Sequence, residues 1–206
     1  IKAIGGAEKI KKVEDLSMDM SVSMAGLPPG TTITGKTLKK RPNYFLQEMT
    51  ISGMGTVSKQ VFDGKTAKVN SMQGNQSFTE GAEFESMKQQ AIFFIENKYA
   101  ELGYETELMA IEMVDGQKAY AVEVTSPSGE KSTEYYAVES GLKIKETSTQ
   151  PGPQGDISVG ASYSNYEAVN GVLFPQKIVI LQGPQKIEMT VTDMKVNVGV
   201  SKADFQ

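Results

Sequence analysis

The clearest pattern in this sequence is a strict alternation of apolar and polar residues near its start. Apolar side chains occupy every second position, with serine or aspartate between them. The apolar positions are Leu16, Met18, Met20, Val22 and Met24. Because successive side chains of a β-strand point to opposite faces, this pattern predicts a strand with one buried face and one solvated face.

Similar segments, separated by turn signals, continue along most of the chain. The predicted strands cover residues 31–39, 44–51, 57–62, 107–114, 118–125, 132–138, 142–149, 157–167, 173–181 and 185–198, with one more strand and a polar loop within 65–79. Residues 150–156 contain prolines and glycines and predict a loop. A change of parity at Thr192-Asp193 predicts a β-bulge in the last strand. Short meander connections predict a mainly antiparallel sheet.

One segment has a helical period instead. Apolar residues recur at steps of three and four over residues 80–99, and residues 91–95 make the C-terminal half apolar on nearly every side. This pattern predicts a long, buried helix, and residues 4–13 predict a short N-terminal helix. The predicted fold is mainly β: a strongly curved antiparallel sheet that wraps the long apolar helix, as a single domain over residues 1–206.

The composition excludes most catalytic chemistry. The chain has no histidine, cysteine or tryptophan, so it lacks an imidazole base, a thiolate nucleophile and the usual ligands of transition metals. We therefore expect no enzyme activity, no metal site and no cofactor. The net charge of −4 argues against a nucleic-acid partner. No apolar stretch is long enough to cross a bilayer, and the start at Ile1 leads us to expect that an upstream segment has been removed.

Eleven methionines are many for a chain of this length. Methionine adapts to irregular apolar partners, so a methionine-lined cavity could hold acyl chains. The predicted cavity lies between the first strand and the long helix. Its residues are Met18, Met20, Val22, Met24, Phe84, Met87, Ala91, Phe94 and Ile95. The alternative, that these residues simply fill a core around the helix, stays open.

Acidic residues offer a further alternative. A hydrolase could use two convergent carboxylates, and the candidates include Glu83, Glu85, Glu105, Glu107, Asp115, Glu123, Glu134 and Glu139. Most of them occupy predicted turns or solvated strand positions. We therefore treat carboxylate catalysis as the least favoured hypothesis.

Several short motifs, in order along the chain, resemble LolA-like domains. They are Ile1-Lys2-Ala3-Ile4-Gly5-Gly6 with Glu8-Lys9-Ile10-Lys11-Lys12-Val13, Val114-Asp115-Gly116-Gln117-Lys118-Ala119-Tyr120, Glu134-Tyr135-Tyr136 through Ser140-Gly141-Leu142, Tyr166 with Asn170-Gly171-Val172-Leu173-Phe174-Pro175, and Ala203-Asp204-Phe205. The resemblance implies a half-open antiparallel barrel with an apolar cavity. It also implies a periplasmic or envelope location in a Gram-negative bacterium.

The best-known protein of that family carries lipoprotein acyl chains across the periplasm and uses an arginine inside its cavity. The only arginine here is Arg41, beside Pro42, and it does not match that position. Similar domains also follow insulinase-type zinc peptidase domains as non-catalytic parts, and this chain has no His-x-x-Glu-His motif.

The sequence thus leads to two functional hypotheses. The first is a non-enzymatic envelope protein that binds a lipid or lipoprotein acyl chain and associates with membranes peripherally. The second is an accessory domain that contacts a neighbouring peptidase domain.

Overall fold

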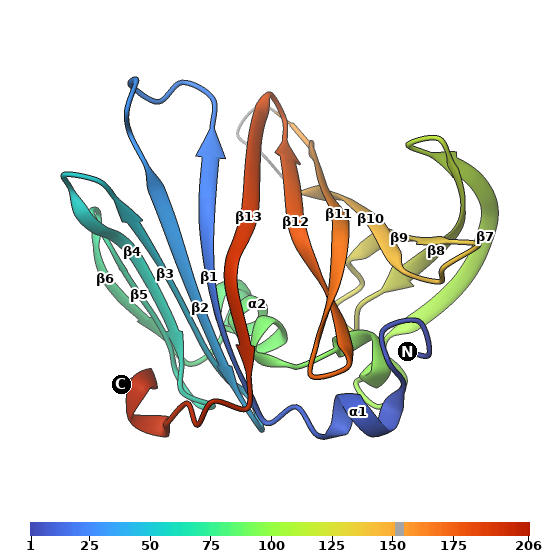
Figure 1. Ribbon diagram of the computed structural model, residues 1–206, viewed down its shortest axis with the longest axis horizontal. Helices are drawn as coiled ribbons and strands as arrows, with labels where there is room; N and C mark the ends of the chain where they lie inside the picture. The colour runs from blue at the N-terminus through green and yellow to red at the C-terminus, as the bar shows by residue number, and fades with distance from the viewer. Residues whose placement is uncertain (151–154) are drawn as a thin grey trace. The chain divides into compact units, whose positions relative to one another are not determined.

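The computed structural model describes residues 1–150 and 155–206, and antiparallel strands dominate it (Figure 1). The strands are β1 (Asp15–Met24), β2 (Ile33–Lys40), β3 (Tyr44–Ile51), β4 (Gly55–Phe62), β5 (Ala67–Ser71), β6 (Gly74–Phe78), β7 (Glu105–Val114), β8 (Gln117–Thr125), β9 (Lys131–Ala137), β10 (Lys143–Gln150), β11 (Ile157–Val169), β12 (Val172–Gln182) and β13 (Gln185–Val196). The helices are α1 (Ala7–Lys11), α2 (Ala82–Ala91) and the 3-10 helices η1 (Ile95–Lys98) and η2 (Lys202–Phe205). The predicted mainly β, antiparallel class is confirmed.

The chain divides into two compact units. The β1–β6 unit comprises Glu8–Ile95 and Met189–Gln206, and the β7–β12 unit comprises Ile1–Ala7 and Glu96–Glu188. In the first unit the strand order is β6-β5-β4-β3-β2-β1-β13, and in the second it is β13-β12-β11-β10-β9-β8-β7. Strand β13 supplies residues to both units, up to Glu188 in one and from Met189 in the other.

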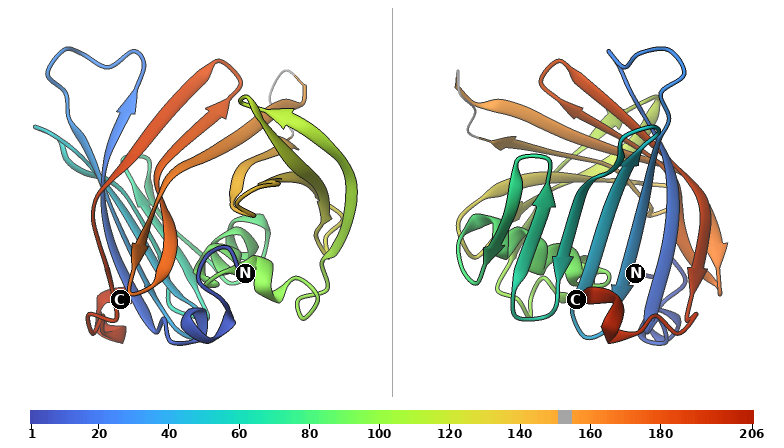
Figure 2. Two further views of the ribbon diagram at one scale, coloured as in Figure 1. Left: turned by 45° about the vertical axis from the view of Figure 1, so that its right-hand side comes forward. Right: turned by 90° about the vertical axis from the view of Figure 1, so that its left-hand side faces the viewer.

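The register of the β1–β6 unit explains where its core lies. Phe45 of β3 pairs with Phe62 of β4, and Phe62 pairs with Ala67 of β5, so their side chains share one face. Helix α2 covers this face and buries Met87 and Ala91 against it (Figure 2). The opposite face carries a second apolar cluster, which η2 covers. Its buried members are Leu46, Val61, Val200 and Phe205.

The β7–β12 unit is a meander of long hairpins. The turn between β7 and β8 is Asp115-Gly116, and both residues have positive φ values of 48° and 84°, as expected of a two-residue hairpin turn. A register shift between Leu108 and Ala110 leaves Met109 without a partner on β8. This bulge changes the parity of the strand, so Leu108 and Ile111 lie on the same face although they are three positions apart in the sequence.

Three element predictions are wrong in extent. The helix predicted over 80–99 stops at Ala91, because Ile92 is extended and Phe94 has a φ of 51°. Successive β-branched and aromatic residues disfavour continuation, and leaving the helix lets Phe93 be buried. Most of α2 is solvated, so the helix is also not buried on all sides.

The other two corrections are shorter. The helix predicted over 4–13 covers only Ala7–Lys11, because Gly5 and Gly6 have positive φ values. Residues 65–79 form two strands, β5 and β6, around a tight turn, where one strand and a loop were predicted.

Three predictions have no test here. The predicted loop over 150–156 includes residues 151–154, which lie outside the described residues. The bulge at Thr192-Asp193 and the single domain over 1–206 stay predictions. Within the described residues, no helix is long and apolar enough to cross a membrane.

Candidate functional site

The candidate site begins with the face of the β1–β6 sheet that α2 covers. The rings of Phe62 and Phe84 meet edge to face, with centroids 5.5 Å apart. Phe78 and Val69 pack against the same cluster. This arrangement attaches α2 to β3, β4 and β5 by apolar contacts, which are non-directional and adaptable.

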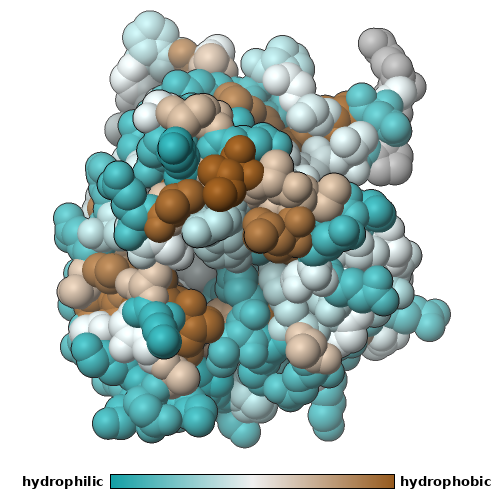
Figure 3. Space-filling model, turned by 90° about the vertical axis from the view of Figure 1, so that its right-hand side faces the viewer, coloured by the Kyte–Doolittle hydropathy of each residue, from teal (hydrophilic) through white to brown (hydrophobic). Residues whose placement is uncertain are grey.

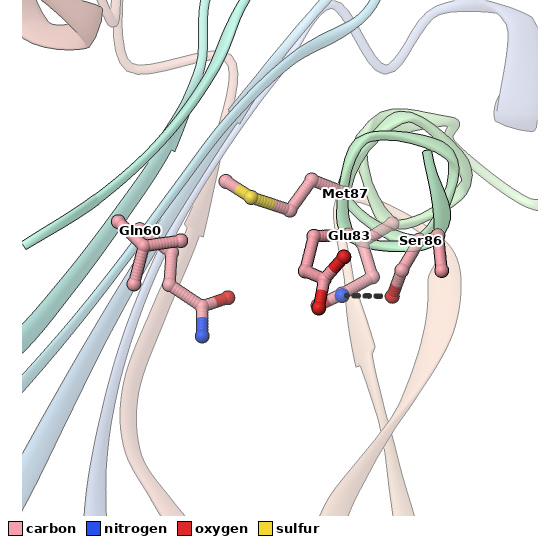
Figure 4. A pocket seen from close by; sticks show the side chains of 7 residues that line it. Gln60, Glu83, Ser86 and Met87 are labelled. Atoms are coloured by element: carbon pink, nitrogen blue, oxygen red, sulfur yellow. Dashed lines mark hydrogen bonds between the residues drawn. The ribbon is translucent and has the colours of Figure 1, made fainter. Parts of the chain in front are cut away.

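A pocket of about 320 Å³ opens between α2 and the sheet. Its lining residues are Gln60, Val69, Ala82, Glu83, Ser86, Met87 and Gln90. In Figure 4 the side chain of Met87 extends from the helix toward the strand that carries Gln60. Ser86 accepts a hydrogen bond of 3.3 Å from the side-chain amide of Gln90 (Figure 4). The pocket thus has an apolar wall at Met87 and Val69 and a polar rim on the helix.

The structure brings only some of the predicted cavity residues together. Phe84, Met87 and Ala91 meet in the cluster under α2. Met20 and Val22 are buried elsewhere on the sheet, where their side chains and Met49 surround Gly35. A Cβ atom at Gly35 would lie 3.2 Å from the Met49 sulfur and 3.4 Å from the Met20 methyl group.

The remaining predicted residues are half-buried. Met18 and Met24 lie on β1, and Phe94 and Ile95 lie beyond the end of α2. Whether any predicted residue contacts a ligand stays a prediction.

One polar atom interrupts the apolar face. Thr37 of β2 pairs with Met18 of β1 and with Gln47 of β3, and Gln47 pairs with Gln60 at the pocket. Thr37 is only 4% exposed. Among the described residues, its hydroxyl oxygen is the one buried side-chain polar atom without a hydrogen-bond partner. Such atoms are uncommon in folded proteins, so this hydroxyl is an unsatisfied polar group within the apolar face.

Sequence reasoning missed the sheet side of the pocket. Gln60 and Val69 become neighbours through the pairing of β4 with β5, and a pairing register cannot be read from one strand. The alternation of Val57 to Phe62 contained part of the signal, since Gln60 and Phe62 share a parity.

The side chain of Arg41 has a structural role, because it joins two segments of the β1–β6 unit. Its guanidinium donates hydrogen bonds of 2.6 Å and 3.1 Å to the carbonyl oxygens of Val13 and Ile10. The same group lies 5.3 Å from the centre of the Phe93 ring. Arg41 thereby ties the end of α1 to the segment after α2, which explains why Phe93 can be buried beside a cation.

The β7–β12 unit contains a different constellation, a buried ammonium group surrounded by carboxylates. The ammonium nitrogen of Lys143 lies 2.5 Å from Glu134, 2.8 Å from Glu146 and 3.4 Å from Glu96. Glu134 is 2% exposed. Its two oxygens also accept hydrogen bonds from the hydroxyls of Tyr99, at 2.8 Å, and Tyr136, at 2.6 Å. We call these residues the Lys143 cluster.

The electrostatics of the cluster follow from burial and charge. Desolvation alone lowers the pKa of Lys143, but Glu146, Glu134 and Glu96 outweigh it and hold the pKa well above its usual value. Burial, and then the negative charge of Glu134, raise the pKa of Tyr99 and Tyr136. Lys143, Tyr99 and Tyr136 therefore keep their protons at neutral pH.

The Lys143 cluster is poorly suited to carboxylate catalysis. Of the acidic residues singled out in the sequence, only Glu134 belongs to it, and both Glu134 oxygens already accept hydrogen bonds. A glycosidase needs two carboxylates that can reach a substrate. Among the described residues, no three acidic side chains come together as they would around a metal ion.

Comparison with known proteins identifies the fold. No family model matches the sequence, and no protein of curated function matches it. A LolA superfamily protein from Nitrosomonas europaea has a similar structure, with a TM-score of 0.65, 14% identity and coverage of 97% of this chain and 94% of that protein. A DUF1329 family protein from Desulfovibrio piger gives a TM-score of 0.66 at 13% identity, covering 97% of this chain and 92% of its own.

A third similar structure is a putative outer membrane lipoprotein-sorting protein domain from Vibrio parahaemolyticus. Its TM-score is 0.60 at 10% identity, and the match covers 94% of this chain and 89% of that domain. The chain therefore has the LolA-like fold, and the resemblance noted in the sequence is confirmed at the level of the fold. The association with a peptidase domain stays a prediction.

Proposed function

We propose that this chain is a non-enzymatic protein of the cell envelope that binds an acyl chain of a lipid or lipoprotein. The observation that carries the proposal is the pocket between α2 and the sheet, next to the apolar cluster around Phe62. The LolA-like fold supports it, because one protein with this fold is described as a lipoprotein-sorting domain.

The dimensions of the pocket fit a slender apolar ligand. Small-molecule sites commonly enclose about 300–1,000 Å³, and this pocket of about 320 Å³ is at the lower end. The flexible side chain of Met87 can move to admit a chain of variable length. Apolar burial would supply the free energy, at about 25 cal/mol per Å² removed from water. The unpaired hydroxyl of Thr37 could receive a polar atom of the ligand.

The proposal also extends the predicted cavity. Acyl chains longer than the pocket would continue over Met18 toward Met20 and Val22, which lie on the same face of β1. A location in the periplasm or envelope of a Gram-negative bacterium, with peripheral membrane contact, is the setting in which such a ligand occurs.

The first experiment is native mass spectrometry of the purified protein, followed by organic extraction and lipid analysis. The expected result is an added mass that extraction identifies as an acyl lipid. The protein is then titrated with a fluorescent fatty acid. A clean mass, together with no binding of the fatty acid, would overturn the proposal.

A matched pair of variants locates the ligand. Ser86→Trp places an indole at the pocket, whereas Lys88→Trp adds the same group to an exposed position of α2 outside the lining residues. We expect Ser86→Trp to weaken fatty-acid binding about tenfold or more and Lys88→Trp to leave it unchanged. Equal affinities in two folded variants would place the ligand elsewhere.

A further inference from the structure

Strand β7 is an edge strand of unusual character. The strand order of its unit ends at β7, and among the described residues no strand pairs with its other side. All ten of its residues except Val114 are exposed. In an antiparallel ladder, every second residue of an edge strand directs its N–H and C=O groups away from its neighbour. β7 therefore offers a line of free backbone donors and acceptors.

The side chains of β7 are sorted between its two faces. Leu108, Ile111 and Met113 pair with Val122, Tyr120 and Lys118 of β8, which alternate along that strand and so share one face. The three apolar side chains are 62%, 58% and 65% exposed. Figure 3 shows hydrophobic side chains exposed on the side from which β7 is seen. The bulge at Met109 produces this face, because it brings Leu108 into phase with Ile111.

The other face of β7 is acidic. Glu105, Glu107 and Glu112 are its only charged residues, and none of them is within ion-pair distance of a basic group among the described residues. Glu107 lies opposite Glu123, and Lys131, which lies 2.6 Å from Glu123, also attracts Glu107 at longer range. Glu105 and Glu112 lie opposite Thr125 and Ala119. The strand thus carries negative charge that its own sheet leaves largely uncompensated.

Proteins keep their edge strands short or place charged residues, lysine above all, or proline on them, because an open edge recruits other strands. β7 is ten residues long and contains neither lysine nor proline. The edge strand β6 is the contrast within this chain, since it has five residues, of which only Phe78 is a large apolar residue. The protective features of β7 are its three glutamates and the bulge at Met109, which lies between two regular stretches.

We propose that β7 is a docking edge for an extended peptide segment of a partner protein, in which apolar residues alternate with lysine or arginine. Such a segment would add a strand to the sheet through main-chain hydrogen bonds. Its apolar residues would cover Leu108, Ile111 and Met113, and its basic residues would lie beside the glutamates. Opposite charges across neighbouring strands are favourable and like charges are not. A second copy of β7 fits poorly for the same reason, because it would bring glutamates together.

Fluorescence anisotropy with labelled ten-residue peptides tests the proposal on the full chain. The probe alternates valine and lysine. One matched peptide alternates valine and glutamate, and the other has the sequence of the probe with N-methyl groups on alternate residues. We expect the valine–lysine peptide to bind and the N-methylated peptide to fail, because N-methylation removes backbone donors. Equal binding of the N-methylated peptide, or no binding of the probe below about 1 mM, would overturn strand addition.

Charge reversal tests the acidic face. The double variant Glu105→Lys and Glu112→Lys changes exposed residues only. We expect it to bind the valine–lysine peptide about tenfold more weakly and the valine–glutamate peptide more tightly. An unchanged preference would overturn the assignment of a basic partner.

Sedimentation velocity of the protein alone tests whether a second copy occupies β7. A monomer is expected. A dimer that Met113→Lys dissociates would make the occupant a second copy and overturn the proposal. The fatty-acid titration is independent of β7, so either proposal can fail alone.

Discussion

Both units of this protein bury apolar residues, but they differ in the charged groups of their interiors. The β1–β6 unit buries aromatic and aliphatic side chains on both faces of its sheet, under α2 on one side and η2 on the other. The β7–β12 unit buries a lysine with carboxylates and tyrosines. Apolar packing tolerates adjustment, whereas a buried charge requires every partner.

This contrast indicates which of the two units can accommodate a ligand. A pocket beside adaptable apolar groups can open or fill at moderate cost, as we propose for the space under α2. The Lys143 cluster leaves little freedom, because Lys143 and Glu134 already have partners in fixed positions. We therefore expect the β7–β12 unit to be the more rigid unit at its centre and to interact through its edge.

The largest effect should come from removing an aromatic ring from the apolar unit. Phe62 is 1% exposed and contacts both the sheet and Phe84. Phe62→Ala should lower the free energy of unfolding by about 3–5 kcal/mol, because it removes buried surface and leaves a cavity. Denaturant unfolding followed by circular dichroism measures this change. A loss below about 1 kcal/mol would show that the cluster repacks freely and is not a defined core.

Breaking the charged interior should cost slightly less. Lys143→Met removes the cation but leaves Tyr99 and Tyr136 donating to Glu134, so we expect a loss of about 3 kcal/mol in the free energy of unfolding. The double variant Lys143→Met and Glu134→Gln should recover part of it, because no unpaired buried charge remains at Glu134. If the double variant is less stable than Lys143→Met alone, the loss of stability does not come from an unpaired charge at Glu134, and the contrast between the two units is wrong.

The sequence allowed one interior to be predicted far better than the other, for a physical reason. Alternation of apolar residues is a local property, so β1 and β3 were predicted within one residue of their ends. The Lys143 cluster joins η1, β9 and β10, and nothing in the local sequence distinguishes Lys143 from a solvated lysine. The helix predicted over 80–99 was too long, because its run of apolar residues fits a buried helix as well as it fits a turn that buries Phe93.

The candidate site shows the same division. Met87 and Ala91 were predicted from helical spacing and are buried under α2. Gln60 and Val69, which complete the pocket, depend on the pairing of β4 with β5. Sequence periodicity thus identifies which face of an element is buried, whereas the partner of that face is decided by long-range pairing.

Alkaline pH should distinguish the two interiors. Tyr99 and Tyr136 have folded-state pKa values above the usual 10.0, through burial and then the charge of Glu134. Their contribution to stability is therefore complete below pH 10 and is lost at higher pH, because the unfolded chain releases these protons first. By pH 10.5 the two tyrosines should lower the free energy of unfolding by about 2 kcal/mol.

Denaturant titrations at pH 8 and pH 10.5 measure this loss, and the double variant Tyr99→Phe and Tyr136→Phe is the control. It should still lose stability between the two pH values, because Tyr163 and Tyr166 are also buried and have raised pKa values. Its loss should be smaller than that of the unvaried protein by about the contribution of the two replaced tyrosines. An equal loss in both proteins would mean that other groups cause the alkaline sensitivity, and the Lys143 cluster would not be its origin.

The smallest effect concerns the one orphan polar atom in the apolar unit. A buried hydroxyl without a partner carries a desolvation cost of about 1–3 kcal/mol, and Thr37 is in that position. Thr37→Val keeps the shape of the side chain and removes the hydroxyl. We expect the free energy of unfolding to rise by up to about 1 kcal/mol, while Thr34→Val, at an exposed position of the same strand, should change it little.

Ligand binding gives this substitution a second readout. If Thr37 receives a polar atom of the ligand, Thr37→Val should weaken binding of the fluorescent fatty acid although the protein is more stable. That opposition between stability and affinity is characteristic of a residue kept for function, since selection for packing alone would favour valine. A variant that is less stable by more than about 1 kcal/mol would instead show that the hydroxyl has a structural partner.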